Sequence, residues 1–75
     1  MTRLIVNVGR RAGVRPQDLV GAITGEAGLS GSAVGAIDIG DDSSIVEVVA
    51  EVANLVMRAL RRARIKGTPI TVRKA

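Results

Sequence analysis

The sequence of 75 residues contains no Phe, Tyr or Trp, and it also contains no Cys and no His. The lack of Cys excludes a disulfide scaffold, and the lack of both Cys and His excludes metal sites built on those two ligands. The same absences exclude the Ser–His and Cys–His nucleophile pairs of hydrolytic enzymes. No run of about 18 uncharged apolar residues is present, so the sequence predicts no membrane-spanning helix.

The sequence does contain enough aliphatic residues for one hydrophobic core, together with an excess of positive charge. Ala, Val, Ile, Leu and Met supply all of the 47% hydrophobic content, and the length fits a single domain. Eleven Lys and Arg, nine of them Arg, oppose seven Asp and Glu and give a net charge of +4. The forked Arg side chain suits phosphates and base edges, so one interpretation is a nucleic-acid partner. The other interpretation is a solvated basic surface.

The hydrophobic periodicity predicts four strands and two helices in the order β-α-β-β-α-β. This is the split βαβ motif of ferredoxin-like folds, an α+β class. We expect a four-stranded antiparallel sheet with both helices on one face, in which the first and last strands do not pair directly. The predicted strands are 3–8, 34–39, 43–48 and 70–73, the last after a turn at 66–69, and the predicted helices run from Pro16 to a cap at Gly28 and from 50 to 62.

Two features of the predicted helices have open interpretations. Gly21 and Gly25 either weaken the first helix or allow it to pack closely on the sheet. Leu55 and Met57 lie outside the core stripe of the second helix, which consists of Val52, Val56, Ala59 and Leu60. They form an apolar patch that is typical of an interaction or homodimerisation surface.

The open face of the sheet is where this fold would bind a ligand. Strand alternation places on it Ile5 and Asn7, then Ser43, Ile45 and Glu47, then Thr71 and Arg73. RNA recognition motifs stack bases on aromatic rings of the two central strands, at the positions that Ile5, Ser43 and Ile45 occupy here. Each such stack contributes about 1–3 kcal/mol, and that contribution is largely missing.

Several stretches are distinctive as a set: 4–11 (LIVNVGRR), 15–28 (RPQDLVGAITGEAG), 37–39 with 46–48, and 65–67 with 72–73. Together they resemble, over nearly the whole chain, the DbpA-type RNA-binding domain at the C-terminus of bacterial DEAD-box RNA helicases of the DbpA and DeaD/CsdA groups. The resemblance implies an RNA-recognition-motif-like domain over 1–75, as the C-terminal fragment of a larger cytoplasmic helicase. The domain itself would have no ATPase activity and no cofactor, since ATP and Mg²⁺ belong to the helicase core.

The function that the resemblance implies is tethering. Such domains hold structured RNA, a ribosomal RNA hairpin or an mRNA, while the core in the same chain unwinds a neighbouring duplex in ribosome assembly, cold adaptation or RNA turnover. DbpA-like relatives often carry Phe where Ile5, Ser43 and Ile45 stand, and an aromatic residue near Gly40. We therefore expect binding that is more electrostatic and less selective, with a DeaD-like or broader RNA preference beside the ribosomal hairpin.

The predicted RNA-binding residues form two groups. Arg10, Arg11 and Arg15 surround the start of the first helix, whose free N–H groups favour a phosphate; the alternative is that they are solvated loop cations. The second group borders the open face and consists of Arg3, Ile5, Asn7, Ile45, Arg73 and Lys74. Arg73 would stack on a base, and Asn7 would either bind a base edge or 2′-hydroxyl or cap the end of its strand.

The remaining charges have expected structural partners. We expect Glu47 to pair with Arg3 or Arg73, and Asp38 to order a nearby Arg. Asp41 and Asp42 are predicted turn formers. The basic run at 58–66 complements the dipole of the second helix or makes secondary RNA contacts. A small enzyme is the weakest alternative, because no catalytic pair is available.

Overall fold

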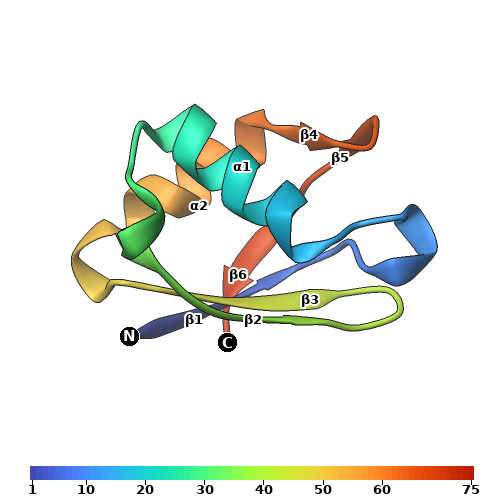
Figure 1. Ribbon diagram of the computed structural model, residues 1–75, viewed down its shortest axis with the longest axis horizontal. Helices are drawn as coiled ribbons and strands as arrows, with labels where there is room; N and C mark the ends of the chain where they lie inside the picture. The colour runs from blue at the N-terminus through green and yellow to red at the C-terminus, as the bar shows by residue number, and fades with distance from the viewer.

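The alternating and helical patterns fold into two layers in the computed structural model, which describes residues 1–75 (Figure 1). One layer is an antiparallel sheet, and α1 and α2 cover one of its faces (Figure 1). The longer elements are β1 (Thr2–Val6), α1 (Pro16–Ala27), β2 (Val34–Ile39), β3 (Ser44–Val48), α2 (Ala53–Arg62), β4 (Arg64–Ile65), β5 (Thr68–Pro69) and β6 (Val72–Lys74). Short 3-10 turns are η1 (Arg10–Ala12), η2 (Gly31–Ala33) and η3 (Ala50–Val52).

The strand order β2-β3-β1-β6 confirms the predicted α+β split βαβ architecture. The expectation that the first and last strands do not pair is wrong. β6 pairs antiparallel with β1, with Ile5 opposite Arg73. The connection from β3 through α2 crosses over β1, so the chain returns to the sheet on the far edge of β1.

A second, two-stranded sheet of β4 and β5 was not predicted. Its turn is at Lys66 and Gly67, whose φ angles of 52° and 77° are both positive, as a type I′ hairpin turn requires. The last strand of the main sheet consequently begins at Val72 rather than at residue 70, and Pro69 lies in strand β5 of the ribbon instead of in the predicted turn.

The core between the layers is entirely aliphatic. The predicted inward faces of β1 and β3 are buried, as are Val56, Ala59 and Leu60 of the predicted α2 stripe, while Val52 is half-buried. Ser44 is the one buried polar residue, and its hydroxyl donates a hydrogen bond of 2.6 Å to the carbonyl oxygen of Val8. This bond ties the start of β3 to the chain just beyond β1.

The structure decides three expectations about the helices. Gly28 ends α1 with a φ of 68°, as predicted, but a Cβ placed at Gly21 or Gly25 would meet nothing within 4 Å. These glycines therefore do not pack α1 onto the sheet. Leu55 and Met57 are half-buried, and the one exposed large hydrophobic residue is Met1, so the predicted apolar patch on α2 is absent. No helix has the length and apolar character needed to cross a membrane.

Candidate nucleic-acid interface

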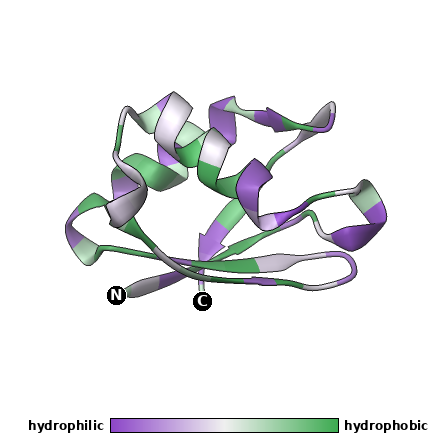
Figure 2. Ribbon diagram, in the orientation of Figure 1, coloured by the Kyte–Doolittle hydropathy of each residue, from purple (hydrophilic) through white to green (hydrophobic).

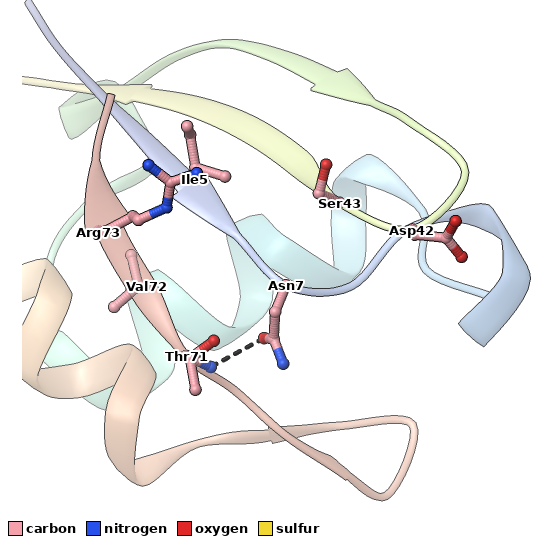
Figure 3. A pocket seen from close by; sticks show the side chains of 7 residues that line it. All are labelled: Ile5, Asn7, Asp42, Ser43, Thr71, Val72 and Arg73. Carbon is pink, nitrogen blue, oxygen red and sulfur yellow. Dashed lines mark hydrogen bonds between the residues drawn. The ribbon is translucent and has the colours of Figure 1, made fainter.

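A hollow of about 310 Å³ opens on the uncovered face of the sheet, between the ends of β1, β3 and β6 (Figure 3). Its lining consists of Ile5, Asn7, Asp42, Ser43, Thr71, Val72 and Arg73. Three of these, Ile5, Asn7 and Arg73, are predicted RNA-binding residues. The strand pairing thus brings together residues from both ends of the chain.

A row of side chains crosses the sheet at the edge of this hollow. Asp38 of β2 is opposite Ile45 of β3, Ile45 is opposite Ile5 of β1, and Ile5 is opposite Arg73 of β6. Ile5 and Ile45 are half-buried and form an apolar centre, whereas Asp38 and Arg73 are exposed at its two sides. The row therefore presents an aliphatic surface with opposite charges at its ends.

Asn7 caps the strand end, which was one of its two predicted roles. Its side-chain oxygen accepts a hydrogen bond of 2.8 Å from the N–H of Thr71, and its own N–H donates to the Thr71 carbonyl at 3.2 Å (Figure 3). The NH₂ has no partner in the protein, so Asn7 offers a ligand these donor hydrogens beside the second lone pair of its oxygen.

Two predicted phosphate-binding cations are paired with carboxylates of the β2–β3 turn. Arg10 Nη2 lies 2.7 Å from Asp41 Oδ1, and Arg11 Nη1 lies 3.6 Å from Asp42 Oδ2. All four side chains are more than 60% exposed, so the pairs are accessible to solvent and to competing anions. A signal for this pairing exists in the sequence. In an antiparallel pair, the Arg doublet that follows β1 meets the Asp doublet that precedes β3.

Arg15 is not brought into this cluster by any contact with Arg10 or Arg11. The start of α1 already holds a carboxylate, because Asp18 accepts a hydrogen bond of 2.9 Å from the Arg15 N–H. Asp18 also lies 3.8 Å from Lys66 Nζ. This negative charge in the first turn opposes a phosphate at the helix N-terminus.

The expected ion pair of Glu47 is wrong. Glu47 is opposite Arg3 in the strand register, yet its carboxylate accepts a hydrogen bond of 3.3 Å from the N–H of Ala36. The register of β2 shifts between Val34 and Ile37, so the N–H of Ala36 lies outside the regular pairing with β3 and is available to Glu47. Asp38 likewise pairs with no Arg. Two exposed cations at this face have no carboxylate partner, Arg3 and Arg73. Lys74, predicted to border the open face, is opposite the buried Leu4 and therefore lies on the helix-facing side of β6.

Residues 3–74 match the family model described as the DbpA RNA binding domain. The chain belongs to this family. It is 40% identical over 73 residues to an ATP-dependent RNA helicase DeaD of Mycobacterium tuberculosis, and 36% identical over 73 residues to the ATP-dependent RNA helicase DbpA of Escherichia coli. The DbpA of Bacillus subtilis is 32% identical over 73 residues.

These alignments cover 97% of this chain but between 13% and 16% of each relative. The DbpA RNA binding domain therefore corresponds to a small part of those helicases. The resemblance read from the sequence is confirmed, and the chain is an RNA-binding module of this family.

Proposed function

We propose that the chain binds RNA through the open face of its sheet, centred on the hollow between β1 and β6. The observation that carries this proposal is the position of Arg73. Its guanidinium is exposed, has no carboxylate partner, and lies beside Ile5 and the hollow (Figure 3). A planar cation next to an apolar surface is suited to holding an unstacked base when aromatic rings are missing.

Each side chain of this face has a chemical role in the proposal. Ile5 and Ile45 provide the apolar floor against which a base lies. The NH₂ of Asn7 donates to a base acceptor or to a 2′-hydroxyl oxygen. Arg3, at the start of β1, contacts a phosphate on this face, and Lys74, at the end of the edge strand β6, contacts another from the opposite side of that strand; neither is neutralised by a carboxylate.

In the longer protein, the role of the domain would be to tether an ATP-dependent RNA helicase core to structured RNA. The names of the relatives and the small share of them that is aligned support a place in a longer chain of this kind. ATP and Mg²⁺ would then be bound by the core. Ribosome assembly, cold adaptation or RNA turnover in the cytoplasm are the corresponding roles.

Homodimerisation through the aliphatic sheet or α2 is less well supported. Leu55 and Met57 are half-buried, and Met57 packs against the core. Apolar area for a stable dimer interface is therefore lacking on α2.

The test is a titration with an RNA hairpin that carries a single-stranded extension. Binding is measured by fluorescence anisotropy at about 50 and about 200 mM salt. We expect affinity to fall steeply with salt, and Arg73→Gln to weaken binding about tenfold at the lower salt. The matched control is Gln17→Glu in α1. It lowers the net charge of the chain by one, as Arg73→Gln does, but on the helical layer, so it should change affinity little. Salt-independent binding, or no binding at low salt, would overturn the proposal.

A further inference from the structure

Most of the net positive charge of the molecule lies on the helical layer and not on the sheet. The sheet strands and the loops at their ends carry five cations and four carboxylates, a net charge of +1. The two helices, their flanking turns and the β4–β5 ribbon carry six cations and three carboxylates, a net charge of +3. A surface for a polyanion is therefore expected on the helical layer as well as on the sheet.

Four arginines account for this excess. They are exposed, form no ion pair and donate no hydrogen bond to the protein, and they are Arg58, Arg61, Arg62 and Arg64. The first three are spaced at i, i+3 and i+4 on α2, so they share one side of the helix. In Figure 1 the end of α2 and β4 lie at the top of the molecule, on the far side of the helices from the sheet. Figure 2 shows strongly hydrophilic positions at the same place.

The dipole of α2 does not account for the whole cluster. Only Arg61 and Arg62 lie in the last turn, and the favourable effect of a helix C-terminus on a cation falls off within one turn. Arg58 precedes that turn, and Arg64 follows in β4. Four like charges within seven residues repel one another, and no carboxylate of the protein offsets the repulsion.

The shape and polarity of this surface favour RNA over a protein partner. Arg58 and Arg61 line a hollow of about 390 Å³ together with Asn54 and Met57. Specific protein interfaces have an apolar centre, but Met57 is half-buried and no large hydrophobic residue is exposed here. Arginine forks arranged around a polar hollow match phosphate oxygens.

We propose that Arg58, Arg61, Arg62 and Arg64 form a second RNA-binding surface, which contacts the phosphates of a double-stranded segment. This rests on the proposed function, because the unpaired segment of the same RNA would lie on the sheet. Double-stranded RNA is recognised mainly through its phosphates and shape, and this needs no stacking side chain. The molecule is only 18–19 Å across its two shorter dimensions, so one structured RNA reaches both layers.

The test uses two RNAs with the 75-residue chain: a blunt duplex of about 16 base pairs and a single strand of about six nucleotides. Arg58→Gln with Arg61→Gln should weaken duplex binding about tenfold and lower the slope of log affinity against log salt by about 1 to 2. It should leave single-strand binding within about twofold of the wild-type value. The independent pair Arg62→Gln with Arg64→Gln should act in the same way. The control is Gln17→Glu with Ser32→Glu, which has the same net charge.

The outcomes separate this proposal from the first one. If the arginine variants match the control on duplex RNA while Arg73→Gln still weakens single-strand binding, the second surface is refuted and the sheet site stands. If polyglutamate of equal charge binds as tightly as the duplex and is lost in the same variants, the surface belongs to an acidic protein partner. If neither RNA binds at low salt, the proposed function itself fails.

Discussion

Arg10 and Asp41 form a forked contact that joins the loop after β1 to the turn between β2 and β3. The Arg10 guanidinium donates to one oxygen of Asp41 at 2.7 Å from Nη2 and at 3.1 Å from Nε. Its Nη1 donates to the carbonyl of Ile39 at 2.8 Å. The sequence predicts a phosphate contact for Arg10, but in the free protein each of its three guanidinium nitrogens already donates a hydrogen bond within the protein. A phosphate must therefore compete with Asp41 for this side chain.

Asp41→Asn should release Arg10 and increase RNA affinity. Both side chains are over 60% exposed, so we expect the substitution to lower the free energy of unfolding by less than about 1 kcal/mol. Affinity for RNA should rise several-fold at low salt, and the gain should shrink as salt screens the charges. Urea denaturation and anisotropy titrations measure the two effects.

Asp38→Asn is the control for this prediction, because it removes the same charge from the same face at a residue that binds no Arg. A larger gain for Asp41→Asn than for Asp38→Asn measures the contribution of the released Arg10. Equal gains would show that Arg10 does not contact RNA.

The two roles of Asn7 are separable by substitution. Asn7→Asp retains an oxygen that accepts from the Thr71 N–H but loses the NH₂, and it adds a negative charge to a hollow that Asp42 already lines. Asn7→Ala loses both groups. We expect Asn7→Ala to cost about 1 kcal/mol of stability and Asn7→Asp to cost less. RNA affinity should fall in both variants and most in Asn7→Asp. Wild-type affinity in Asn7→Asp would exclude the NH₂ as an RNA contact.

Gly9 is needed because two backbone segments approach closely at this position. A Cβ at Gly9 would lie 2.2 Å from the carbonyl oxygen of Gly40 and 2.8 Å from that of Asp41. Neither neighbour is a flexible side chain, so the loop must move. We expect Gly9→Ala to lower the free energy of unfolding by about 2 kcal/mol. Gly21→Ala, where a Cβ meets nothing within 4 Å, should instead stabilise α1 by up to about 1 kcal/mol. Chemical denaturation of both variants tests the contrast.

Periodicity was sufficient to predict the layers and the open face, because each rests on local alternation. Leu4, Val6 and Val8 alternate with Ile5 and Asn7, and the structure buries the first set and leaves the second at the open face, half-buried or exposed. The β4–β5 ribbon escaped prediction because strands of two residues have no period to detect. The failure at Glu47 has a different cause: a shift of register in β2 supplies a backbone N–H that no pattern in the sequence reveals.

The charges of the site were the least predictable feature, because their partners come from distant segments. Arg10 and Asp41 are 31 positions apart, and Asn7 and Thr71 are 64 apart. Composition identified the positive excess but not its location. The Arg and Asp doublets were a signal for the pairing of Arg10 and Arg11 with the turn carboxylates, but this signal depends on knowing that β1 pairs with β3.

Restoring an aromatic ring to the centre of the sheet should change how this domain binds RNA. Ile5 is half-buried in the cross-sheet row, beside Ile45 and Arg73, so a Phe ring there would lie against the hollow. A base stacked on that ring gains about 1–3 kcal/mol, which corresponds to a rise in affinity of roughly five- to 150-fold. Since stacking is not ionic, Ile5→Phe should raise affinity at high salt as well as at low salt.

The matched control is Ile5→Leu, which keeps the position aliphatic and should leave RNA affinity within about twofold of the wild-type value. Anisotropy titrations of both variants at two salt concentrations with a short single strand give the comparison. An Ile5→Phe variant that folds but binds no better than Ile5→Leu would place the bases away from β1. In that case, the phosphate contacts of the arginines alone would account for binding.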